Sequence, residues 1–240
     1  MEEIAKNENM AAEYFNFAKI IKSLQNKNTA SAKKLGIFYD IHGEWDKATT
    51  ILNDILNKGI DDIIPLLSLV ETKKHNFERS ILLLERYGLM HNNATALKNA
   101  SILKLLIKKI PEKICISEII DYEKQSGCIE RLDVEGATHI ISQFFAAEKL
   151  LNANLYDKAL RIISELSKSF PAAELEFLSA RAFYGLGEYP LAIMQINNVL
   201  MENISDWEAW VLMGNSYWAM NKKNAAKKIY VIAKMFFQLI

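Results

Sequence analysis

The chain has 240 residues, half of them hydrophobic, which is enough to build a core as one or two globular domains or as one extended solenoid. Basic and acidic residues number 29 each, so no bulk charge favours binding to nucleic acid or to an acidic membrane. Four prolines and nine glycines are too few for a long Pro/Gly-rich linker, and they suit a mostly helical chain.

The sequence predicts a cytoplasmic protein. Residues 1–9 carry acids where a secretory signal needs a basic start and an apolar run. No uninterrupted apolar run reaches the roughly 20 residues that span a bilayer, and Lys234 breaks the apolar stretch 229–240. Cys115 and Cys128 fit a reducing compartment. A place at the periphery of a membrane assembly stays compatible with these features.

In chain order, residues 1–28 come first. Their apolar side chains between positions 11 and 25 fall on one helical face, so we expect an N-terminal helix that is a candidate cap for the helices after it. Residues 29–91 predict two helix hairpins. The first, over 29–58, keeps small residues at Gly36 and Ala48, whereas the second, over 61–88, is degenerate.

Residues 92–137 predict a weaker hairpin followed by an irregular connection. Helical periodicity over 96–109 is interrupted by Pro111 and resumes over 114–124. The stretch 126–136 contains Gly127 and Gly136 and lies outside the repeat period. If the chain has a hinge or a subdomain boundary, we expect it here.

Residues 138–240 predict three further hairpins, for a total of about six plus the N-terminal helix. The strongest signal is a pattern that recurs after 34 residues, a period typical of stacked helical hairpins. Its members are Ala180, Phe183, Gly187, Tyr189, Ala192 and Ile196, which recur as Gly214, Tyr217, Asn221, Lys223, Ala226 and Tyr230.

Two local features of the last hairpin give sharper predictions. Gly214 lies inside a predicted helix, where it costs about 1 kcal/mol relative to alanine. We expect close approach of the second helix at Ala226 to offset that cost. Residues 205–208, with the sequence Ser-Asp-Trp-Glu, predict a capping box at the start of the first helix.

These residues resemble the tetratricopeptide repeat, which has an aromatic, a small residue and a tyrosine on its first helix and alanines around an aromatic or aliphatic residue on its second. The matching positions in the last hairpin are Trp210, Gly214, Tyr217, Ala226, Tyr230 and Ala233. The resemblance implies an all-α fold, a right-handed α-solenoid of stacked antiparallel helix hairpins.

The resemblance also implies a binding surface, because in this family the first helices line a concave groove that holds peptides. Aromatic side chains on such an exposed face usually mark a contact site. The alternative is that they pack against neighbouring hairpins or a terminal helix. The predicted groove residues are Phe144, Glu148, Leu151, Phe177, Arg181, Tyr184, Val211, Asn215 and Trp218.

One subtype of the family clamps the carboxylates of chaperone tails with a lysine and an asparagine on its first helices. The equivalent positions here hold Lys33 and Ile37 in one hairpin and Phe144 and Glu148 in another, so that clamp is not expected. The groove is instead aromatic and mixed in charge, which favours an extended or helical partner segment with apolar anchors.

Lysines gather in two stretches, over 98–113 and over 222–234. Either stretch could meet an acidic partner or an anionic lipid surface, but a solvated helix face is the simpler interpretation. Nucleic-acid binding would need a stronger net positive charge with aromatics interleaved, so we expect none.

Catalytic signals are missing. His42, His75, His91 and His139 are scattered, and no paired metal-ligand motif, phosphate-binding loop or nucleophile elbow occurs. We therefore expect no enzyme, no cofactor and no metal site.

The leading hypothesis is a scaffold, adaptor or dedicated chaperone that holds a protein segment in its groove. At the level of fold, the last three hairpins also resemble class II chaperones of bacterial type III secretion. The alternative is a self-associating subunit of a secretion or transport assembly, whose C-terminal end lacks a polar capping helix. The residues expected at that interface are Met235, Phe236, Phe237, Leu239 and Ile240.

Overall fold

The computed structural model describes residues 29–108, 134–169 and 172–238, and these residues are almost entirely helical. The helices pair as antiparallel hairpins, which confirms the predicted all-α hairpin array. Their bounds are α2 (Thr29–Ile41), α3 (Trp45–Leu56), the short 3-10 helix η1 (Asp61–Ile63), α4 (Ile64–Lys73), α5 (Phe77–His91), α6 (Ala94–Lys108), α8 (Val134–Asn152), α9 (Tyr156–Ser169), α10 (Ala173–Gly185), α11 (Tyr189–Glu202), α12 (Trp207–Ala219) and α13 (Lys223–Phe237).

Each complete hairpin turns through one residue in the left-handed backbone conformation. A positive φ requires glycine or a residue that tolerates that region, such as asparagine. The 34-residue pattern places Gly187 and Asn221 at equivalent positions, and both have positive φ. The repeat signal in the sequence therefore contains the turn geometry itself. The turn residues with positive φ are Gly43, His75, Asn154, Gly187 and Asn221.

The start of α12 is capped, although not by the residue that opens the predicted capping box. Asp206, rather than Ser205, is the N-cap, and its carboxylate accepts a hydrogen bond from the backbone N–H of Ala209 at 3.0 Å. The Ser205 hydroxyl donates instead to the Asn203 side chain at 2.7 Å. A single carboxylate thus satisfies the helix end, and its charge suits the helix N-terminus.

Gly214 is explained by a different neighbour from the one predicted. A Cβ atom at Gly214 would lie 2.5 Å from Cε1 of Tyr230, so the tyrosine ring, not Ala226, lies over this glycine. Gly36 has the same place in the first hairpin, where its close neighbour is the Leu52 side chain. The small residue on the first helix therefore makes room for a large residue on the second.

Because of this contact, the effect of Gly214→Ala on stability should change sign when the Tyr230 ring is removed. We expect Gly214→Ala to lower the free energy of unfolding by about 1–2 kcal/mol, because overpacking costs about 1–3 kcal/mol and exceeds the gain in helix propensity. In a Tyr230→Ala background the same change should stabilise the protein by about 0.5–1 kcal/mol. Urea unfolding of the four proteins measures both values, and equal destabilisation in the two backgrounds would refute the explanation.

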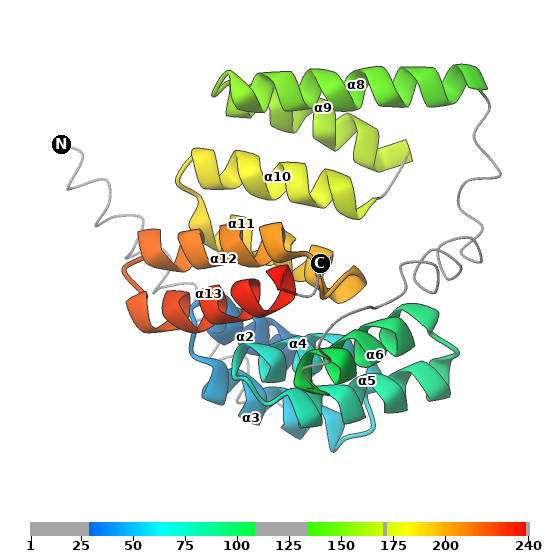
Figure 1. Cartoon of the computed structure of the whole chain (residues 1–240), viewed down its shortest axis with the longest axis vertical. Helices are drawn as coiled ribbons and strands as arrows, with labels where there is room; N and C mark the ends of the chain where they lie inside the picture. The colour runs from blue at the N-terminus through cyan, green and yellow to red at the C-terminus, as the bar shows by residue number, and fades with distance from the viewer. Residues whose placement is uncertain (1–28, 109–133, 170–171, 239–240) are drawn as a thin grey trace.

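The hairpins are not stacked in simple chain order along the molecule. In Figure 1, α8 to α10 lie at one end, α11 to α13 lie in the middle, and α2 to α6 lie at the other end. One hydrophobic core is shared between α2–α6 and α11–α13, and a second core joins α8, α9 and α10. The N-terminal hairpins therefore fold against the C-terminal ones.

Three first helices of the N-terminal half, α2, α4 and α6, all contact α11. At the centre of this contact, Lys73 on α4 donates from Nζ to both carboxylate oxygens of Asp40 on α2 and to Oδ1 of Asn197 on α11, each at 2.8 Å. Asn197 in turn donates from Nδ2 to Asp40 at 2.8 Å. All three side chains are buried. Burial lowers the pKa of Lys73, and the neighbouring Asp40 carboxylate opposes that effect.

Two further polar side chains, Asn99 and Tyr217, fix the same contact through hydrogen bonds. On α6, Asn99 donates from Nδ2 to the carbonyl of Met201 at 2.8 Å and accepts from the backbone N–H of Ile204 at 3.2 Å. On α12, the Tyr217 hydroxyl donates to the carbonyl of Asp40 at 2.8 Å. Burial, with a smaller effect from Asp40, raises the pKa of Tyr217 well above its usual value, so this hydroxyl keeps its proton.

The first-helix surface of the N-terminal half is therefore filled by the chain's own helix α11. The sequence did not predict this arrangement. Several other predictions lie outside the described residues: the N-terminal helix over 11–25, the helix over 114–124, the two cysteines and most of the candidate hinge over 126–136, of which residues 134–136 begin α8.

Candidate functional site

The first helices of the C-terminal hairpins, α8, α10 and α12, carry all nine residues predicted to form the groove. Several of them pack inward. Leu151 is only 4% exposed and belongs to the α8–α10 core, while Phe144 is half-buried against the same core. Phe177 and Val211 pack against the larger core. Packing within and between the hairpins therefore buries most of the surface of these four apolar side chains, as in the alternative to an exposed groove.

The polar groove residues bridge neighbouring first helices. Arg181 on α10 donates from Nη2 to Oδ1 of Asn152 at 3.1 Å, and its Nη1 lies 4.0 Å from Oε1 of Glu148 on α8. About a third of the side-chain surface of both Arg181 and Glu148 stays exposed. A pair this long and this accessible contributes little to stability, so the guanidinium remains able to bind another carboxylate.

A cavity of about 470 Å³ opens beside Arg181, which we call the tyrosine pocket. Its walls come from all three first helices and from the first residues of the second helices α9 and α11. Tyr184 and Tyr189 face one another across one side with their ring centroids 5.5 Å apart. The lining residues are Leu151, Tyr156, Arg181, Tyr184, Gly185, Tyr189 and Leu212.

A glycine sets the depth of this pocket. A Cβ atom at Gly185 would lie 2.3 Å from the ring of Tyr156, so the ring rests directly on the end of α10. The Tyr156 hydroxyl donates to Oδ1 of Asn154 in the turn at 2.6 Å, which holds the ring in that position. The pocket wall is thus preorganised by one ring, one glycine and one turn residue.

Asn215 and Trp218 continue the surface along α12. Asn215 accepts a hydrogen bond at 2.7 Å from the hydroxyl of Tyr230. Burial, and to a lesser degree Tyr184, raises the pKa of Tyr230, so this donor stays protonated near neutral pH. Trp218 is 50% exposed, and the ammonium of Lys223 lies 5.7 Å from its ring centroid.

The C-terminal end exposes less apolar surface than the sequence predicted. Phe236 is buried, with its ring stacked on Trp210 at a centroid distance of 6.1 Å, so it is not available to a second copy. Met235 is partly buried against the same core. Phe237 is 58% exposed and touches Trp207, whereas Leu239 and Ile240 lie outside the described residues. Of the five residues expected at an oligomer interface, the described part offers only Phe237 as a largely exposed apolar side chain.

The pocket contains four residues that sequence reasoning missed, Tyr156, Gly185, Tyr189 and Leu212. The sequence contains a signal for two of them, Tyr156 and Tyr189. Every second helix among the first four complete hairpins begins with an aromatic residue, at Trp45, Phe77, Tyr156 and Tyr189. That regularity is as compatible with packing between hairpins as with a pocket, so by itself it does not single out a site.

Two other kinds of feature are absent from residues 29–108, 134–169 and 172–238. No group of three or more histidine, cysteine, aspartate or glutamate side chains there is placed to hold a metal ion. None of the described helices has the combination of length and apolar character that crossing a bilayer requires.

No protein-family model matches the chain, and no curated protein matches its sequence. Solved structures with a similar helical arrangement include MamA from Desulfovibrio magneticus RS-1, at 9% identity and a TM-score of 0.40 over 88% of this chain and 95% of that one. MamA AMB-1 matches at 14% identity and a TM-score of 0.39 over 87% and 99%. The TPR2AB domain of yeast Sti1, solved as a complex with pHSP90, matches at 14% and 0.39 over 87% and 90%. Similarity at this level adds nothing to the assignment of the site.

Proposed function

We propose that this protein is a non-catalytic binding protein whose tyrosine pocket holds a segment of a partner protein. The observation that carries the proposal is the pocket itself, a preorganised aromatic cavity with one accessible guanidinium at its edge. Pockets that bind protein segments combine apolar walls with a few placed polar groups, and tyrosine and arginine are prominent among residues that dominate binding energy.

The pocket chemistry describes the partner segment. Tyr156, Tyr184 and Tyr189 offer ring surface to an aromatic or aliphatic anchor side chain. The guanidinium of Arg181 can pair with a carboxylate of the segment next to that anchor, since its own contact with Glu148 is 4.0 Å long. We expect a segment with one large apolar residue and an acidic residue close to it in space.

The contrast between the two halves supports this location. The N-terminal first helices already pack on α11, so that surface has no room for a partner in this conformation. The C-terminal first helices keep the pocket and the exposed Trp218. A scaffold, an adaptor and a dedicated chaperone, including one for a secretion system, would all use such a groove, and the partner's identity distinguishes them.

Peptide selection tests the proposal. Random peptides of about 12 residues displayed on phage are selected on the full chain, and the enriched peptides are titrated calorimetrically. We expect Tyr184→Ala to weaken binding at least about tenfold, because loss of a central interface tyrosine commonly costs more than 1 kcal/mol. Arg181→Glu should remove the preference for acidic peptides.

The matched control is Leu82→Ala, which removes a 68% exposed side chain on α5, far from the pocket in sequence and on another hairpin. It should bind selected peptides as the wild type does. Peptides that bind Tyr184→Ala and wild type equally well would refute the pocket as the site.

A self-associating subunit, the alternative from the sequence, has less support. Phe236 is buried, and the exposed surface of α13 carries lysines. Two copies that met through this helix would bring like charges together, which opposes association.

A further inference from the structure

The last helix has an unusual charge. After Glu208 the sequence contains no aspartate or glutamate, whereas five lysines lie between positions 222 and 234. The chain as a whole has equal numbers of acidic and basic residues, so positions 222–234 carry a strong local excess of positive charge. We call this surface of α13 the lysine face; its residues are Lys222, Lys223, Lys227, Lys228, Val231 and Lys234.

Helical spacing brings most of these side chains to one side. Lys223, Lys227, Val231 and Lys234 follow one another at intervals of four, four and three, so they form a single exposed row along α13. The opposite side of the helix is buried in the hairpin through residues such as Ile229 and Ile232. The row is therefore fixed in position by the core beneath it.

The described lysines of this face form no close ion pair, although Lys228, after Lys74, contributes to the lowered pKa of Asp46. Some lysines on other helices are paired, as in the contact between Lys33 and Asp62 at 2.5 Å and the contact between Lys74 and Asp46 at 2.8 Å. Within the described residues no ion pair involves any lysine of α13. Two of these lysines instead lie over aromatic rings, Lys223 over Trp218 at 5.7 Å and Lys228 over Trp45 at 5.8 Å.

We propose that the lysine face is a second docking surface, separate from the tyrosine pocket, for an acidic helical segment of another protein. A helix with carboxylates at intervals of three or four residues would match the lysine row, with an apolar residue such as leucine set against Val231. Trp218 and Phe237, which are 50% and 58% exposed, flank the row and add apolar contact at its edges.

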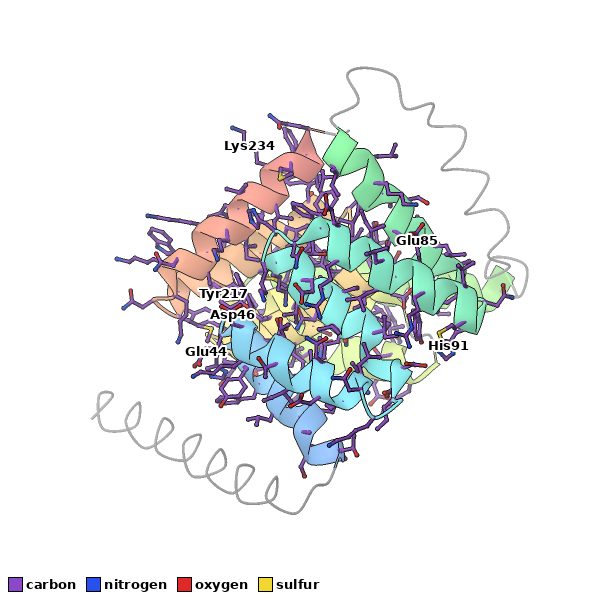
Figure 2. The ribbon with its side chains drawn as sticks, turned by 90° about the horizontal axis from the view of Figure 1, so that it is seen from below. Glu44, Asp46, Glu85, His91, Tyr217 and Lys234 are labelled. Carbon is purple, nitrogen blue, oxygen red and sulfur yellow. The ribbon has the colours of Figure 1, made fainter. Side chains whose placement is uncertain are left out.

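An anionic membrane is a poorer match for this surface. A hollow where α13 meets the start of α3 is lined by Glu44 and Asp46 together with Lys47, Lys74 and Lys228. Figure 2 shows Glu44 and Asp46 together at this junction and Lys234 at the far end of α13. A hydrogen bond from Lys74 holds the pKa of Asp46 below its usual value, so its charge persists. Lys47 and Lys74 pair with these carboxylates, so the hollow interrupts the positive surface that a flat anionic membrane would cover, whereas a narrow acidic helix can lie along the lysine row alone.

The test uses a fluorescent model peptide of about 18 residues, long enough to form a helix, with glutamates at every fourth position around two central leucines and no basic residue. We expect it to bind the full wild-type chain. The charge-reversal variant Lys223→Glu/Lys227→Glu/Lys234→Glu should bind at least about tenfold more weakly, and raising the salt from about 0.05 M to about 0.3 M should weaken wild-type binding.

The matched control is Lys34→Glu/Lys58→Glu/Lys158→Glu, which makes the same change in net charge at exposed lysines on other hairpins. It should bind the peptide as the wild type does, and so should Tyr184→Ala, which separates this surface from the pocket. Equal binding by the two triple variants, or equal binding of a peptide with glutamine in place of glutamate, would overturn the proposal. So would wild-type binding to phosphatidylserine vesicles, lost in the α13 variant, without binding to the peptide.

Discussion

Lys73→Ala is expected to lower the free energy of unfolding by about 3–5 kcal/mol, because it leaves the buried carboxylate of Asp40 without its cationic partner. Both side chains are fully buried and lie between α2, α4 and α11, so bulk solvent does not reach the carboxylate to replace the ammonium. Chemical denaturation followed by circular dichroism measures the loss.

The control for this prediction is the exposed pair Lys33 and Asp62, which joins α2 to η1 with 39% and 61% of the side chains exposed. Lys33→Ala should cost less than about 1 kcal/mol. The double variant Asp40→Ala/Lys73→Met should cost less than the sum of its single changes, since neither charge is then left alone. Equal small effects of Lys73→Ala and Lys33→Ala would show that the contact between the two halves is not held by this network.

Trp210→Ala is the second change with a large expected effect, a loss of about 3–5 kcal/mol in the free energy of unfolding. Trp210 is fully buried, its ring stacks on Phe236, and its Nε1 donates to the carbonyl of Ile204 at 2.8 Å. The substitution removes the ring and leaves a cavity between α12 and α13, together with an unpaired carbonyl. Urea unfolding checks the value.

Trp218→Ala is the matched control, because it removes the same side chain from the same helix at a position that is 50% exposed. We expect a change within about 0.5 kcal/mol, as for most surface substitutions. A comparable loss at both positions would contradict the assignment of Trp210 to the core and of Trp218 to the surface.

The hairpins could be predicted because their determinants are local and periodic. Gly187 and Asn221 close equivalent turns, and Gly214 packs under a residue only sixteen positions away. The period between hairpins makes each such position visible twice. Even here the sequence indicated Ala226 where the structure has Tyr230, since spacing shows that two helices approach but not which side chain fills the contact.

The contact between the halves could not be predicted because nothing periodic marks it. Asp40, Lys73 and Asn197 come from three helices far apart in the chain, and each alone is an ordinary polar residue on a helix. Their burial depends on how the N-terminal hairpins fold back, which repeat spacing does not describe. A repeat pattern predicts which hairpins are neighbours along the array. It does not predict contacts between hairpins that are distant in the chain.

The residues that line the tyrosine pocket could be predicted in part, for a related reason. Helical spacing placed Arg181 and Tyr184 on the outer side of α10, and both line the pocket. It also placed Leu151 on the outer side of α8, where it lines the pocket but is 4% exposed, because the width of the buried stripe on a helix depends on how many neighbours cover it. Tyr156 and Tyr189 belong to the second helices, whereas the predicted groove drew only on the first helices.

The most direct test of the tyrosine pocket as the binding site is hydrogen exchange of the full chain with and without a peptide selected by phage display. We predict slower exchange at residues 148–156, at residues 181–189 and around Leu212 on α12, with α2, α4, α6 and the part of α11 beyond its first turn unchanged. Slower exchange in α2, α4 and α6, together with faster exchange in α11, would contradict this prediction, because the partner would then have displaced the chain's own helix from the N-terminal surface.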